Sequence, residues 1–76
     1  MSKIDYKERI IYDSTVMLGK PVIKGTRIPV ELILRRLSEG MPIEKLLDSY
    51  PNLTEEDIKA VLAYSADLVA NEEVVG

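Results

Sequence analysis

Residues 19–30 read Gly-Lys-Pro-Val-Ile-Lys-Gly-Thr-Arg-Ile-Pro-Val, and this stretch decides how the rest of the chain is arranged. Its glycines and prolines separate short β-branched segments, so we predict turns near Gly19 and at Lys24-Gly25, with extended backbone after each turn. This pattern predicts a small hairpin. Pro29 then fixes φ near the helical value, and the N–H group that it lacks is one that the first turn of a helix leaves unpaired. A helix can therefore begin directly after the hairpin.

The segment before this stretch contains the best strand candidate, Ile10-Ile11-Tyr12. A strand this short needs a partner, and two partners are open. One is the Val22-Ile23 segment, and the other is the same strand in a second copy of the chain. Residues 1–28 are therefore predicted to form an extended N-terminal arm and hairpin.

Residues 29–70 are predicted to form three helices. The first covers about residues 29–39 and ends at Gly40, where a positive φ is needed. Its apolar positions recur at helical spacing and are Val30, Ile33, Leu34 and Leu37. The second helix begins after Met41-Pro42 and stops before Pro51. Its apolar positions repeat the same spacing and are Ile43, Leu46, Leu47 and Tyr50.

The third helix has the fullest start signal in the chain. Thr54 and Asp57 form a capping box, and Leu53 and Ile58 occupy the two positions of a hydrophobic staple. The helix is predicted to continue to Ala70, with residues 71–76 as a frayed tail. We therefore expect a single, mainly α domain in which a three-helix bundle follows a short β-hairpin arm. The second and third helices have the spacing of a helix-turn-helix.

The composition excludes several classes of site. The 76 residues include no cysteine and no histidine, so disulfides, thiolate ligands and Ser-His-Asp or Cys-His catalysis are excluded. We expect no metal site, no cofactor and no small-molecule substrate, and an enzyme is the least expected class. No apolar run approaches the ~18 residues that a membrane span requires, and the N-terminus lacks a signal-peptide core. A soluble cytoplasmic protein without membrane contact is expected.

The charges are unevenly distributed along the chain. Residues 1–36 carry a net charge of +4 and residues 37–76 a net charge of −7, within an overall charge of −3. This distribution favours an acidic or polyanionic partner for the N-terminal half, with head-to-tail self-association as the alternative. The candidate DNA- or partner-binding residues are the cations Lys20, Lys24, Arg27, Arg35 and Arg36.

Other interpretations of the charged and aromatic residues remain open. The five cations could instead form a solvated surface with local ion pairs, and Arg27 could make a structural bond to backbone carbonyls or a carboxylate. Residues 55–57, Glu-Glu-Asp, are interpreted as helix capping, and they disfavour entry of this helix end into a DNA groove. The tyrosines are expected to fill the core or a dimer seam; they are Tyr6, Tyr12, Tyr50 and Tyr64.

Several segments resemble one known family. They are Val16-Met17, Gly19-Lys20-Pro21, residues 23–30, residues 53–58 and Ala63-Tyr64. They are similar to the small prokaryotic family catalogued as domain of unknown function 433, over roughly residues 10–66. Two positions depart from the pattern, because Leu18 stands where relatives often carry glycine and Pro42 where they often carry a serine cap. The resemblance implies a homeodomain-like helix-turn-helix fold. In VapB-like relatives it implies the antitoxin half of a toxin–antitoxin pair whose toxin is a PIN-like nuclease.

These observations lead us to expect a homodimeric, antitoxin-like protein that binds and neutralises a PIN-like nuclease toxin. Its cations would enter the acidic, Mg²⁺-binding site of the toxin, and its own promoter DNA is an additional candidate partner. Two alternatives stay open. One is a DNA-binding transcriptional regulator without a toxin partner, and the other is a structural dimerisation module in which Ile10-Ile11-Tyr12 pairs between two copies.

Overall fold

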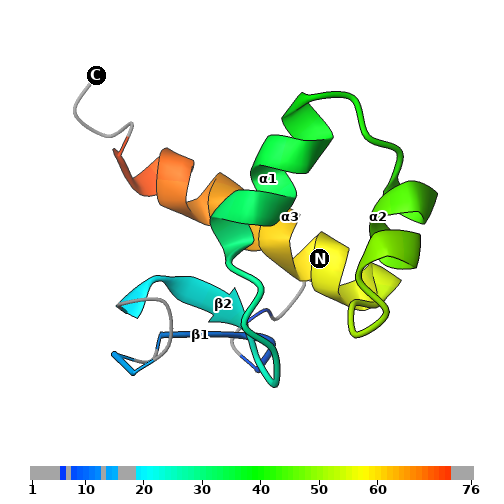
Figure 1. The fold of residues 1–76 in the computed structure, drawn as a ribbon. Helices are drawn as coiled ribbons and strands as arrows, with labels where there is room; N and C mark the ends of the chain where they lie inside the picture. Colours follow the sequence, from blue (N-terminus) through cyan, green and yellow to red (C-terminus); the bar gives the residue numbers. More distant parts are fainter. Residues whose placement is uncertain (1–5, 7, 13, 16–18, 73–76) are drawn as a thin grey trace.

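The computed structural model of the protein describes residues 6, 8–12, 14, 15 and 19–72. Within these residues the chain forms a two-stranded hairpin followed by three helices (Figure 1). The elements are β1 (Ile10–Tyr12), β2 (Pro21–Ile23), α1 (Val30–Ser38), α2 (Ile43–Ser49) and α3 (Glu55–Glu72). The mainly α fold with a preceding hairpin, predicted from the sequence, is confirmed.

The strand β1 pairs antiparallel with β2, with Ile10 opposite Ile23 and Tyr12 opposite Pro21. Of the two partners left open by the sequence, the structure therefore shows the one in the same chain. The expected extension after the turn is shorter than a strand. It consists of an isolated bridge between Val22 and Pro29, next to a 3.0 Å hydrogen bond from the N–H of Ile23 to the carbonyl of Ile28. Pro29 has no N–H to donate, so the ladder stops there.

The turn predicted at Lys24-Gly25 is confirmed. The N–H of Thr26 donates to the carbonyl of Ile23 at 3.0 Å, and Gly25 has a φ of +82°, as the third position of a type II turn requires. The hydroxyl of Thr26 donates to the same carbonyl at 2.8 Å and accepts the N–H of Ile28 at 3.0 Å. The turn is therefore held by side-chain as well as backbone bonds, and Lys24 lies exposed at its tip.

Local capping signals define most of the helix ends. At the end of α1, Gly40 has a φ of +91° and its N–H donates to the carbonyl of Leu37 at 3.0 Å. The N–H of Met41 donates to the carbonyl of Arg36 at 3.1 Å, which completes a Schellman motif. At the start of α3, Thr54 Oγ1 accepts the N–H of Asp57 at 3.2 Å, and Asp57 Oδ2 accepts the N–H of Thr54 at 3.0 Å. Both predicted signals are confirmed.

The helix α3 continues to Glu72, two residues past its predicted end. Residues 73–76, the remainder of the predicted frayed tail, lie outside the described residues. Within those residues, no helix combines the length and apolarity needed to cross a membrane.

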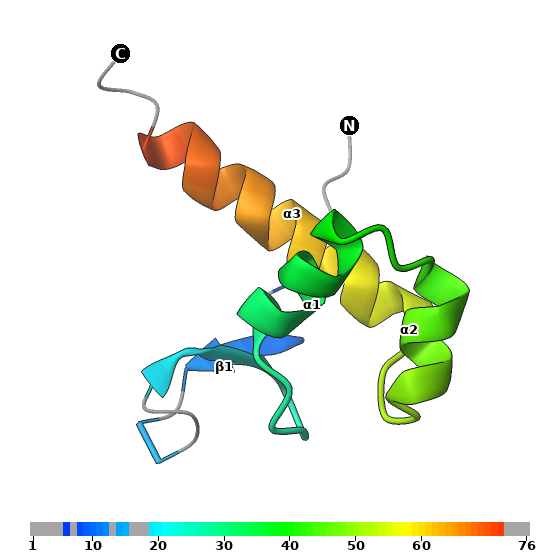
Figure 2. The same ribbon diagram turned by 45° about the horizontal axis from the view of Figure 1, so that its top comes forward.

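The helices α1 and α3 pack across each other, and α1 also contacts both β2 and α2 (Figures 1 and 2). In both views the hairpin lies below α1, and α2 lies to its right. The buried core draws on the hairpin, on all three helices and on the loop before α3. It consists of Ile10, Ile23, Val30, Ile33, Leu46, Leu53, Ile58, Ala60 and Val61. The last of these is Val61, so only the first two turns of α3 enter the core.

Some apolar side chains of the predicted helices are exposed. Ile43 was expected on the apolar face of its helix, but it is 39% exposed at the start of α2. In the second half of α3, Leu68 and Val69 are 48% and 60% exposed, although the helix itself continues as predicted. The helical spacing identified the helices correctly, but it did not indicate where the neighbouring elements end.

Candidate binding surface

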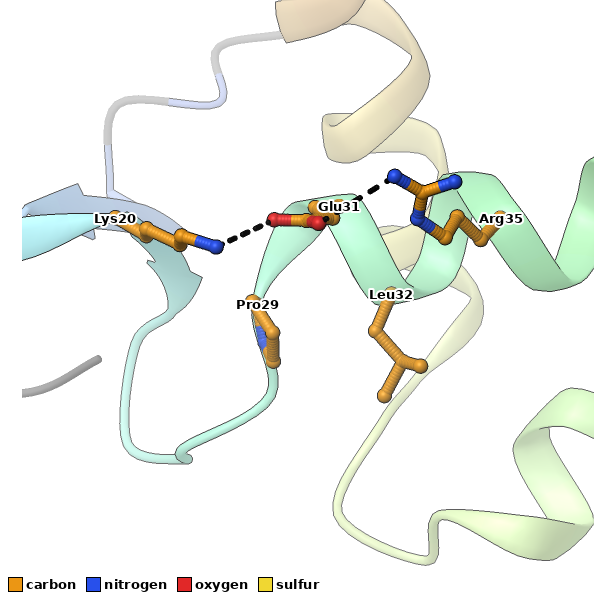
Figure 3. Close-up of a pocket in the computed structure, with 5 residues that line it drawn as sticks. All are labelled: Lys20, Pro29, Glu31, Leu32 and Arg35. Carbon is orange, nitrogen blue, oxygen red and sulfur yellow. Dashed lines mark hydrogen bonds and ion pairs between the residues drawn. The ribbon is translucent and has the colours of Figure 1, made fainter. Parts of the chain in front are cut away.

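A pocket of about 340 Å³ lies beside the first turns of α1, where two of the predicted cations meet (Figure 3). Pro29 and Leu32 contribute apolar side chains to its wall, and the charged residues Lys20, Glu31 and Arg35 complete the lining. Lys20 reaches this place because it directly precedes β2, which packs against α1. The other charged residues stand four positions apart on α1 and therefore share one helix face.

Glu31 lies between the two cations of the pocket. Lys20 Nζ donates to Glu31 Oε1 at 3.0 Å, and Arg35 Nη2 lies 3.7 Å from Glu31 Oε2. The hydrogen bond and charge of Lys20, and then the charge of Arg35, lower the pKa of the Glu31 carboxyl below its ordinary value. The sequence analysis did not single out Glu31. Glu31 stands four residues before Arg35, and this spacing on a helix could have indicated an ion pair between them.

Lys24 and Arg27 lie on the turn between β2 and α1, and both are exposed. Within the described part of the chain neither residue forms an ion pair. No structural bond from Arg27 to a backbone carbonyl or a carboxylate is present there either, although the sequence left that alternative open. These two cations are therefore available to a partner without first breaking a bond to the described residues.

Arg36 does not line the pocket. Its Nη1 lies 3.1 Å from Glu39 Oε1, and Tyr50, the residue that follows α2, lies beside it. The nearby Tyr50 hydroxyl, and then the bond and charge of Glu39, raise the pKa of the Arg36 guanidinium. The five predicted cations therefore divide into Lys20 with Arg35 at the pocket, Lys24 with Arg27 on the turn, and Arg36 beside Tyr50.

A second polar cluster joins the N-terminal arm to α3. Arg9 Nη1 lies 3.1 Å from Asp57 Oδ1, and Asp57 is only 6% exposed. The hydroxyl of Tyr6 donates to Asp67 Oδ2 at 2.8 Å. Neither contact could be predicted from the sequence, because each one joins residues that are far apart in the chain. This cluster attaches the arm to the bundle.

The tyrosines of this cluster differ in burial. Tyr6 packs edge-to-face on Tyr64, with the ring centroids 5.5 Å apart, and both side chains are half-buried against the core. The hydroxyls of Tyr12 and Tyr64 are hydrogen-bonded, but Tyr12 is 62% exposed and does not fill the core. Burial, followed by the bond to Tyr12, raises the pKa of Tyr64 to about 12. Among the described residues, no three His, Cys, Asp or Glu side chains are grouped so as to hold a metal ion.

Comparison with known proteins gives a consistent family match. The family model described as "Protein of unknown function (DUF433)" matches residues 10–65. The crystal structure of a DUF433 member from Anabaena variabilis superposes with a TM-score of 0.77 at 30% identity, covering 92% of this chain and 71% of that one.

Two curated proteins are also similar. An uncharacterized protein of Archaeoglobus fulgidus is 68% identical over 28 residues, which cover 37% of this chain and 78% of that protein. Uncharacterized protein y4eO of Sinorhizobium fredii is 29% identical over 59 residues, which cover 78% of this chain but only 27% of y4eO. The domain therefore also occurs as about a quarter of a longer protein.

Proposed function

The chain belongs to the DUF433 family of proteins of unknown function, and on that premise we propose that it is a non-enzymatic, antitoxin-like protein that binds and neutralises a PIN-like nuclease. The observation that supports this proposal is that Lys24 and Arg27 lie exposed on a hydrogen-bonded turn and form no ion pair with any residue that the structure describes. Three hydrogen bonds hold the backbone of this turn, so binding orders the two long side chains but does not also have to order the backbone that carries them.

A protein partner fits this chain better than DNA does. In a helix-turn-helix the N-terminal end of the second helix of the pair enters the major groove. Here that end belongs to α3, where Glu55 and Glu56 are exposed and would face the phosphates. The overall charge of −3 also opposes a polyanion. The turn supplies two cations, which is few for DNA, because DNA affinity comes from the neutralisation of several phosphates.

The proposed mechanism is occupation of the active site of the nuclease. The toxins of such pairs bind Mg²⁺ through clustered carboxylates, which attract Lys and Arg side chains. A cation from the turn would lie among these carboxylates, compete with the metal and block access of the nucleic acid substrate. Charge-assisted bonds of this kind are strong where they are shielded from water. The chain supplies no nucleophile or base in this scheme.

The test is to mix the purified protein with the PIN-like protein encoded beside it, and to measure both complex formation and nuclease activity. We expect a stable complex by size-exclusion chromatography with light scattering, and loss of nuclease activity. The double change Lys24→Ala with Arg27→Ala should weaken binding about tenfold or more. The matched control is Lys45→Ala with Lys59→Ala, which removes two exposed lysines from α2 and α3. Unchanged nuclease activity in the presence of the wild-type protein would refute the proposal.

A DNA-binding regulator without a toxin is the second candidate, because the same cations could contact phosphates. If it is correct, DNA affinity falls steeply as the salt concentration rises. The Lys24→Ala, Arg27→Ala variant should then reduce the slope of log affinity against log salt concentration by about two. Binding that is absent, or that does not respond to salt, would dismiss this candidate. The third candidate is a purely structural dimerisation module. It predicts a homodimer whose stability does not change when Lys24 and Arg27 are replaced by alanine.

A further inference from the structure

The pocket beside α1 has an apolar wall and a charged rim, and the two together restrict what it can bind. Pro29 and Leu32 provide the wall, and the rim combines two cations with one carboxylate (Figure 3). The net charge of the rim is therefore positive. A ligand that satisfies both features carries a carboxylate next to an aliphatic side chain.

Arg35 is the rim residue with the most unused binding capacity. Its contact with Glu31 is long, at 3.7 Å, and its side chain is 70% exposed. A guanidinium has five N–H donors, and exposed ion pairs of this kind are weak. A second carboxylate can therefore bind Arg35 while Glu31 keeps its shorter bond to Lys20.

The chain itself contains a segment with this chemistry. Residues 73–75 read Glu-Val-Val and directly follow α3, outside the described residues. We propose that this segment of a second copy docks in the pocket, with the carboxylate of Glu73 on Arg35 and the valines against Pro29 and Leu32. The charge distribution supports this arrangement. The pocket belongs to the half of the chain with a net charge of +4, and residues 73–75 belong to the half with −7.

The geometry of α3 favours a second copy over the same chain. Val61 of α3 shares the core with Val30 and Ile33 of α1, which are the neighbours of the pocket residues. From Val61 to Glu72 the helix rises about 16 Å. Residues 73–75 span at most about 11 Å when extended. To reach the pocket of its own chain, the segment would have to turn back along α3 and cover about 16 Å, although its extended length is only about 11 Å.

The end of α3 supplies a further reason to expect a second copy there. Leu68 and Val69 are 48% and 60% exposed within two turns of the segment. A copy that takes the Glu73–Val75 segment also meets these side chains and covers apolar surface. This inference does not rest on the proposed function, because it concerns the protein alone. If both hold, the second copy uses the pocket, whereas the partner uses Lys24 and Arg27 on the turn, which do not line it.

The experiment is a charge-reversal cycle on the full chain, followed by sedimentation equilibrium over a range of concentrations. We expect the wild type to self-associate, and Arg35→Glu or Glu73→Lys alone to weaken association about fivefold or more. The double variant Arg35→Glu with Glu73→Lys should restore it, because the pair is then reversed. Lys45→Glu, an exposed change on α2, is the matched control and should have less effect than Arg35→Glu. A monomer at every concentration, or a double variant no tighter than the singles, would overturn the proposal.

A peptide titration distinguishes docking at this pocket from association elsewhere. The probe is the acetylated and amidated peptide of residues 70–76, added to the ¹⁵N-labelled full chain. Amide shifts should concentrate at Lys20, Leu32 and Arg35, and the Glu73→Lys peptide should produce fewer of them. Shifts confined to α2 would contradict the assignment. A separate comparison tests docking within one chain. If the wild type is strictly monomeric and deletion of residues 73–76 changes the amide shifts of the pocket residues, the segment docks in its own chain and the second copy is refuted.

Discussion

Asp57 is the residue on which the attachment of the arm to the bundle depends. Its carboxylate accepts the N–H of Thr54 at the start of α3 and also pairs with Arg9 from the arm. The capping role could be predicted, since it follows from a local pattern of four residues. The pairing with Arg9 could not, because the two residues stand 48 positions apart and no local pattern marks them as partners.

We predict that Asp57→Ala lowers the free energy of unfolding by about 2 kcal/mol, because one change removes a helix cap and a partner of Arg9. Thr54→Ala should cost about 1 kcal/mol, since it removes only the reciprocal cap. Urea denaturation followed by circular dichroism measures both. The control is Glu56→Ala, an exposed change in the same turn. Equal effects of Asp57→Ala and Glu56→Ala would show that the carboxylate of Asp57 contributes nothing specific.

Tyr64 leads to a prediction about alkaline pH. Burial and the bond to the Tyr12 hydroxyl raise its pKa from 10.0 to about 12 in the folded protein. The folded state therefore favours the neutral phenol, and this stabilisation is complete below pH 10 and is lost as the pH rises from 10 toward 12. Tyrosinate absorbance should show one group with a pKa of about 12. Tyr12→Phe should lower the pKa of that group, and a titration curve without such a group would contradict the prediction.

At the level of elements, the positive φ of Gly40 ends α1 and directs the chain toward α2. An added Cβ at Gly40 meets no atom within 4 Å, so the cost of a side chain there is backbone strain alone. We predict that Gly40→Ala lowers the unfolding free energy by about 1 kcal/mol and that Gly40→Asn costs less. Gly25 has a φ of +82° and equally open surroundings, so Gly25→Ala is the matched comparison. A stabilising effect of Gly40→Ala in thermal melts would contradict this account.

The elements that the sequence predicts well are those with local signals. Pro29, Gly40 and the Thr54 capping box each act within a few residues, and the structure places helix ends within a residue or two of them. The cations of the candidate site could be predicted from the sequence, but their positions relative to one another could not. Lys20 and Arg35 lie on different elements, and only the packing of β2 against α1 brings Glu31 between them.

At the level of the whole molecule, α3 extends beyond the core that its first turns help to build (Figure 2). The radius of gyration is 12.7 Å, compared with about 11.4 Å expected for a compact chain of 76 residues. The sequence predicted the length of α3 but not this overhang, because the spacing of apolar residues is the same whether or not another element covers them. The two halves of α3 should therefore respond differently to substitution.

We predict that Leu68→Gln with Val69→Gln changes the free energy of unfolding by less than about 0.5 kcal/mol, since both side chains lie outside the core. Val61→Ala should cost about 1 to 2 kcal/mol, because Val61 is fully buried on the same helix. Urea denaturation at a low protein concentration measures both, so that association does not contribute. Sedimentation of the Leu68, Val69 variant should in turn show weaker self-association than the wild type. If the double change instead destabilised the isolated chain as much as Val61→Ala, the overhang would be part of the folded core, and the exposed half of α3 could not serve as a contact surface.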